Sequence, residues 1–188
     1  MDSGFKLGSL GREVGVITED RGAGIAGTVG VFGKGVPVRM NLRDLDRGVE
    51  RNAGVTVVES PKLTPTLVST SVYSLLNKTL DRVGGGTAKV NIKITPVDPK
   101  LPILERRNMV YSGSSVSEKS IDELFDIVES LMNNAFKDYE IRDIQVDVQV
   151  EEAKRTATII DASADQVIVS PGDNIVITAN LQAYREGQ

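Results

Sequence analysis

The stretch TEDRGAGIAGTVGVFGKGVPV, residues 18–38, decides the fold because it contains the Gly-x-Gly-x-x-Gly string of dinucleotide-binding loops at residues 22–27. Strand-like sequence precedes the string. Asp44 and Asp46 follow about twenty positions later, where an acidic residue could hold a ribose. A doubly wound α/β fold would require a helix immediately after the glycines, because the helix N-terminus binds the pyrophosphate.

The residues after Gly27 do not favour a helix. The sequence TVGVFGKGVPV contains three more glycines, several valines and Pro37, all of which are poor helix formers. The next convincing helical pattern begins near Pro65. The dinucleotide interpretation is therefore rejected, because the helix that it requires after the glycines is not predicted. A tightly turning β segment explains the glycines better, because glycine permits positive φ and close backbone approach.

The composition of the 188-residue chain limits its chemistry. Apolar residues make up 40% and aromatic residues only 4%, so the core must consist of Val, Ile and Leu, which suits sheets. The chain has no His and no Cys, which excludes a Ser-His-Asp triad, thiolate catalysis and Cys-ligated zinc. The net charge is −4 and the basic residues are scattered, so we expect no nucleic-acid partner. No cofactor is predicted.

Two helices are predicted, at residues 65–83 and 120–136. Thr64 is the candidate N-cap of the first helix, and glycines from residue 84 onwards end it. Ser120 and Glu123 form a Ser-x-x-Glu capping box at the start of the second. The predicted apolar faces of the two helices comprise Val68, Val72, Leu75, Leu76, Leu80 and Val83, and Ile121, Leu124, Val128, Leu131, Met132 and Ala135.

The remaining segments are typical of strands and turns. Residues 87–97 and 143–152 alternate apolar and polar side chains, and a proline-containing connection follows the first of these segments. The other predicted strands cover 13–18, 28–32, 36–42, 54–60 and 156–160, with two more in 166–184 around Pro171-Gly172-Asp173 and turns at 46–52 and 152–154.

The resulting order, β-β-β-β-α-β-α-β-β-β-β, predicts an α+β fold with mostly antiparallel sheet. We expect an α+β domain over residues 1–163. Residues 164–188 then form a terminal hairpin packed on that domain, or the start of a truncated β-sandwich segment.

Two groups of acidic residues have simple structural explanations. Residues 44–48, DLDRG, match part of a calcium loop but lack its other ligands, so a hairpin turn is the better interpretation. Asp143, Asp147 and Glu151 occupy alternate positions of one predicted strand and are expected to form a solvated face. No metal site is predicted.

A Ser/Lys hydrolase is the one catalytic alternative that needs no His. The candidate pairs are Ser74 with Lys78 and Ser115 with Lys119. In each pair the lysine follows the serine by four residues, which is ordinary surface spacing, and the second serine lies in a predicted flexible loop. Both pairs are therefore better explained as structural.

The most distinctive part of the sequence is the segment around the glycines at residues 22–27. An Asp and an Arg beside tight turns often hydrogen-bond backbone groups, and this structural role is preferred here over a ligand site. The predicted structural or contact segment comprises Asp20, Arg21, Gly22, Gly24, Gly27 and Gly30.

Five successive blocks of the chain resemble secreted bacterial proteins that carry a SpoIVB-type serine peptidase domain. The blocks are VGVITEDRGAGIAGTVG, ESPKLTPTLVSTSVYSLL, GGGTAKVNIKI, NNAFKDYEIRDIQVDVQV and VSPGDNIVITANLQAYRE. Their order matches and they cover most of the chain, although none is a catalytic signature.

The resemblance implies that the chemistry lies elsewhere. The family's catalytic His and Ser belong to Gly-His-Pro-like and Gly-x-Ser-Gly-Ser-Pro-like motifs, which this chain lacks and which the resemblance places before residue 1 of a longer parent. No catalytic residue can be carried over. The segment with Asp20 and Arg21 matches the block after the peptidase-like core, and the tail resembles the start of a further β-sandwich segment.

These observations predict a non-catalytic accessory or interaction module of an exported, extracytoplasmic peptidase-like protein. Its partners would be the remaining domains of the parent, another protein or the cell envelope. Exposed sheet edges and the glycine-rich segment are the expected contact surfaces. No apolar run is long enough to span a membrane. The sequence does not indicate an oligomeric state, and a peptide-cleaving Ser/Lys hydrolase remains the alternative.

Overall fold

The computed structural model describes residues 11–81 and 84–184 and confirms the predicted α+β fold. The contacts divide the chain into two units, one up to Gly35 and one from Val36 onwards. Among its described residues, 11–35, the first unit contains one antiparallel hairpin, formed by β1 (Gly15–Arg21) and β2 (Gly24–Val29).

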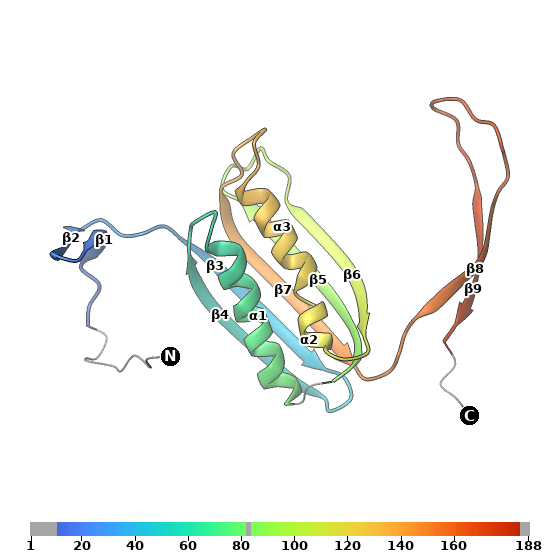
Figure 1. Ribbon diagram of the computed structural model, residues 1–188, viewed down its shortest axis with the longest axis horizontal. Helices are drawn as coiled ribbons and strands as arrows, with labels where there is room; N and C mark the ends of the chain where they lie inside the picture. The colour runs from blue at the N-terminus through green and yellow to red at the C-terminus, as the bar shows by residue number, and fades with distance from the viewer. Residues whose placement is uncertain (1–10, 82–83, 185–188) are drawn as a thin grey trace. The chain divides into compact units, whose positions relative to one another are not determined.

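A five-stranded sheet forms the centre of the second unit (Figure 1). Its order is β4-β3-β7-β5-β6, and β3 is parallel to β7 whereas β5 is antiparallel to both β7 and β6. The strands are β3 (Gly35–Asp44), β4 (Val49–Val58), β5 (Gly86–Pro96), β6 (Leu104–Ser112) and β7 (Ile141–Glu151).

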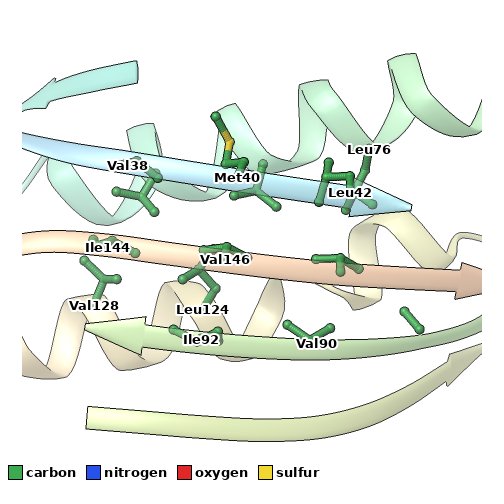
Figure 2. Packing of buried hydrophobic residues seen from close by; sticks show 14 of the residues in the cluster. Val38, Met40, Leu42, Leu76, Val90, Ile92, Leu124, Val128, Ile144 and Val146 are labelled. Atoms are coloured by element: carbon green, nitrogen blue, oxygen red, sulfur yellow. The ribbon is translucent and has the colours of Figure 1, made fainter. Parts of the chain in front are cut away.

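Three helices cover one face of this sheet, as Figure 1 shows: α1 (Thr64–Leu80), α2 (Val116–Lys119) and α3 (Asp122–Met132). Alternate side chains of β3, β5 and β7 point toward the helices, as the strand period of two requires. Figure 2 shows Leu76 of α1 and Leu124 of α3 packed with these strand residues. The predicted alternation of β5 and β7 is confirmed, with Ala88, Val90, Ile92, Ile94, Ile144, Val146, Val148 and Val150 all buried.

The ends of α1 differ from the prediction. Leu63 is the N-cap, and Thr64 is already helical. The Thr64 hydroxyl donates to the carbonyl of Val58 and accepts from the amide of Ser60, so it ties the helix to β4. The helix stops at Leu80 because Asp81 adopts a left-handed conformation, with φ 51°. The predicted end at residue 83 lies outside the described residues.

The predicted second helix is divided into α2 and α3. Ser115 caps α2 by accepting from the amide of Glu118. Ser120 is buried and donates to the carbonyl of Val116, so the predicted capping box with Glu123 is wrong. The helix also ends at Met132, short of the predicted residue 136.

Glu123 joins α3 to β6. Its carboxylate accepts from Arg106 and from the side-chain amide of Asn108. Strand β6 is not predicted by the sequence pattern, which indicates only a loop between β5 and the next helix. Its LERRNMVYS sequence has two adjacent arginines and weak alternation, which is compatible with a sheet edge, where one side of the strand is unpaired.

The C-terminal strands also differ from the prediction. β8 (Ala157–Ala164) pairs with β9 (Ile177–Ala183) and not with β7, and the segment around Pro171 is a loop between them. Every residue of both strands is exposed. The predicted boundary at residue 163 falls within β8.

Replacement of Leu76 by Ala tests the core. Leu76 is 1% exposed, so the change creates a cavity and should lower the free energy of unfolding by about 2–5 kcal/mol. Leu67→Ala on the same helix is the matched control, because Leu67 is 38% exposed and should cost less than about 1 kcal/mol. Urea denaturation measures both, and equal losses would contradict the assigned packing.

Glu123→Gln tests the link between α3 and β6. Burial raises the pKa of Glu123, but the hydrogen bonds from Asn108 and Arg106 and the Arg106 charge outweigh it and lower the pKa below 4.5. This lowered pKa contributes stability above about pH 4.5 that is lost as the pH falls through the folded-state value. The stability difference between the wild type and the variant should therefore shrink at low pH in urea titrations. A pH-independent difference would contradict the link.

Candidate functional site

The predicted contact segment lies on the β1–β2 hairpin. Asp20 and Arg21 end β1, and the chain turns at Gly22 and Ala23. The guanidinium of Arg21 lies 3.1 Å from the carboxylate of Glu19, and both side chains are exposed. Within the described residues, neither Asp20 nor Arg21 bonds the backbone through its side chain as the structural interpretation expected.

Two glycines allow the strands of this hairpin to approach closely. A Cβ at Gly27 would lie 2.8 Å from the carbonyl oxygen of Val16, and one at Gly15 would lie 2.2 Å from that of Thr28. Strand β2, not a helix, contains Gly27 and ends at Val29. The structure therefore agrees with rejection of a dinucleotide loop, because no helix N-terminus follows the glycines in this described segment to bind the pyrophosphate.

The β1–β2 hairpin presents a largely apolar face. A register shift between Ile17 and Glu19 places Ile17, Ile25 and Val29 on one face, and their side chains are 65%, 68% and 81% exposed. Asp20 lies on the same face, opposite Ile25. The face therefore combines apolar contact area with one carboxylate.

The β8–β9 hairpin has one face made only of apolar side chains, and Ile160 lies outside that face as the unpaired residue of a bulge. A bulge at Ile160 shifts the register between Ile159 and Asp161, which reverses the face that the rest of β8 presents. One face consequently carries Ala157, Ile159, Ala162, Ala164, Ile177, Ala179, Leu181 and Ala183, and the other carries Thr158, Asp161, Ser163, Thr178, Asn180 and Gln182. All eight apolar residues are exposed.

This hairpin face is not evident in the sequence because simple alternation fails across the bulge. The pattern of residues 157–164 is regular only if one residue is removed at Ile160. A search that allows one bulge would have found the amphipathic pattern, because β9 alternates without interruption.

Cation–π contacts and hydrogen bonds hold the start of this hairpin. The Lys154 ammonium lies 3.8 Å from the ring centre of Tyr184 and 5.1 Å from that of Tyr111 on β6. The Thr87 hydroxyl donates to the carbonyl of Ala153 and accepts from the amide of Arg155. The connection from β7 to β8 is thus fixed to the main sheet.

The sheet face opposite the helices is polar. Register places Asn41, Asp147, Asn91 and Arg107 in one row across β3, β7, β5 and β6. An open hollow of about 760 Å³ lies beside this row, where Gly54 of β4 leaves room. Its lining is mostly amide and charged, so it suits a polar ligand better than an apolar one.

The acidic row predicted on β7 is more than a solvated surface. Asp143 is half-buried and accepts from Arg39 at 2.6 Å, and Glu151 accepts from Arg155. Asp147 accepts from Gln145 at 3.1 Å. These carboxylates are structural partners of neighbouring side chains.

The calcium-like residues 44–48 form a turn, as predicted. The buried carboxylate of Asp44 accepts from the amides of Asp46 and Arg47, and Gly48 has φ 65°. Among the residues described, no group of three His, Cys, Asp or Glu could hold a metal ion.

The structure gives the predicted Ser/Lys pairs no catalytic geometry. Ser74 and Lys78 are exposed on α1. Ser115 serves as a helix cap, and Lys119 is exposed and donates to Asp122 at 2.9 Å. Both lysines are exposed, so neither pair forms a serine beside a buried lysine in a pocket.

The structure places a different serine in the same hollow as Lys119. Ser69 is 4% exposed, and its Oγ has no hydrogen-bond partner in the described structure. It lines an open hollow of about 550 Å³ between α1 and α3, together with Lys119 and Asp122. The sequence could not indicate this pair, because the two residues lie on different helices.

Comparison of the chain with protein-family models, curated proteins and solved structures gave no match. In the described part of the chain, no helix combines the length and apolar character needed to cross a membrane.

Gly27→Ala tests the close approach in the β1–β2 hairpin. The new methyl group would meet the Val16 carbonyl, so the strands must separate. The expected result is loss of NMR cross-strand contacts between Val16 and Thr28, which are paired in the structure. Gly33→Ala is the control, because a Cβ at Gly33 would meet no atom within 4 Å. Retained contacts in the Gly27 variant would contradict this geometry.

Proposed function

We propose that the chain is a non-catalytic accessory or interaction module of an exported SpoIVB-type peptidase-like protein. Its role is to support the peptidase region or to bind a protein or cell-envelope partner. The observation that carries the proposal is the exposed apolar face of each hairpin. A two-stranded sheet is marginally stable alone, and such faces gain stability when another surface covers them.

The chemistry of the chain supports a role without catalysis. His and Cys are absent from the full sequence, and the predicted Ser/Lys pairs are exposed or act as caps and ion-pair partners. Extracytoplasmic location is part of the proposal and rests on the resemblance alone.

The resemblance suggests a partner for the first hairpin. In the SpoIVB-type proteins the matching block follows the peptidase-like core, so the face with Ile17, Ile25 and Val29 would pack against that core. Asp20 on this face would then meet a donor or a cation in the partner, because an unpaired carboxylate is costly to bury.

Binding of the full chain to a recombinant peptidase-like core tests this role. Ile25→Asp should weaken binding at least tenfold, because it adds a second carboxylate to the contact face. Thr28→Asp is the matched control on the opposite face of the same strand and should change binding little. Isothermal titration calorimetry measures both, and absence of binding by the wild type would contradict the supporting role.

Labelling with a serine-reactive fluorophosphonate tests the Ser/Lys alternative. We expect no labelling of this chain and labelling of a longer form that includes the catalytic motifs. Ser69→Ala, Ser74→Ala and Ser115→Ala identify the nucleophile if the chain is labelled. If the chain is labelled and one of these changes abolishes the labelling, the non-catalytic proposal is overturned.

A further inference from the structure

The apolar face of β8–β9 consists of four cross-strand rows. From the start of the hairpin they are Ala157 with Ala183, Ile159 with Leu181, Ala162 with Ala179, and Ala164 with Ile177. The side chains of the first and third rows are small, those of the second row are large, and the fourth row pairs a small residue with a large one. Ile159, Leu181 and Ile177 are each more than 60% exposed, so the large side chains stand as isolated ridges.

We infer that this face packs against the same face of a second copy of the chain. An antiparallel two-fold arrangement, centred between the second and third rows, places the large row of each copy over the Ala162 and Ala179 row of the other. The same rotation places the first row over the fourth. The large rows therefore meet alanine rows at the centre, the small first row meets the mixed fourth row at each end, and the contact is closed and self-complementary.

The β8–β9 face is uncharged, and this favours a second copy of the same face as its partner over the other faces of the chain. The eight residues of the face include no charged or polar side chain, and Asp161 lies on the opposite face. The β1–β2 face carries Asp20, which β8–β9 would bury without a partner. The open face of the five-stranded sheet is polar and would leave its amides and charges unsatisfied.

The size of the face sets the expected strength. Two strands of about eight residues present roughly 10 by 25 Å, from the usual strand spacing and rise. Covering this area in both copies buries roughly 500 Å² in total, well below the roughly 1,200 Å² at the lower end of standard interfaces, so the association must be weak and reversible. The dimer should therefore form and dissociate with concentration. This inference rests on the proposed interaction role and names one partner for it.

Sedimentation equilibrium of the full chain over a range of concentrations tests the inference. We expect a reversible monomer–dimer equilibrium. Leu181→Glu should weaken it at least tenfold, because the carboxylate would be buried in the interface. Gln182→Glu is the matched control, since Gln182 is adjacent but lies on the polar face opposite the uncharged Thr158, and it should leave the equilibrium unchanged. Circular dichroism verifies that the helices remain folded in both variants.

A row exchange tests the two-fold geometry. Ile159→Ala with Leu181→Ala, or Ala162→Ile with Ala179→Leu, removes the match of large and small rows, and each pair should weaken the dimer. All four changes together exchange the rows and should restore it, because the two-fold rotation relates those rows.

A monomer at every concentration, larger assemblies, a dimer insensitive to Leu181→Glu, or failure of the fourfold variant to recover would overturn the inference. Binding to the peptidase-like core is measured separately through the first hairpin. Loss of the dimer therefore does not decide the proposed supporting role.

Discussion

The constraint on which the structure depends is that an apolar sheet face must be covered. The five-stranded sheet meets it with α1, α2 and α3, which bury one face of β3, β5 and β7. The apolar faces of the two hairpins are not covered by helices, and their large apolar side chains are exposed. The chain thus combines a domain with its own core and two segments whose apolar faces remain uncovered.

The hairpins obtain their exposed faces by different backbone devices. In β1–β2, Gly15 and Gly27 remove side chains where the opposite backbone comes close. In β8–β9, a bulge at Ile160 realigns the alternation so that no polar residue lies on the apolar face. Both features shape a surface, and neither adds to the core of the five-stranded sheet.

Sequence reasoning identified the elements whose signals are local. The alternation of residues 87–94 and 144–150 predicted two of the three inner strands, β5 and β7, with their buried side chains, and the absence of a helical pattern after Gly27 excluded a doubly wound fold. It failed where contacts between different elements determine the partners of a side chain. Ser120 bonds the carbonyl of Val116 instead of capping a helix, and Glu123 binds Arg106 and Asn108 across a strand that the pattern did not reveal.

Hydrogen exchange monitored by mass spectrometry tests the central claim, which is that the hairpin faces are contact surfaces and the five-stranded sheet is the independent core. In the dilute chain, we predict slow exchange in β5 and β7 and fast exchange in β1–β2 and β8–β9. With the peptidase-like core present and the chain concentrated, protection should rise in both hairpins and stay unchanged in the sheet. Slow exchange of the hairpins in the dilute chain would contradict the claim. Unchanged exchange of the hairpins in the concentrated chain with the peptidase-like core present would also contradict it.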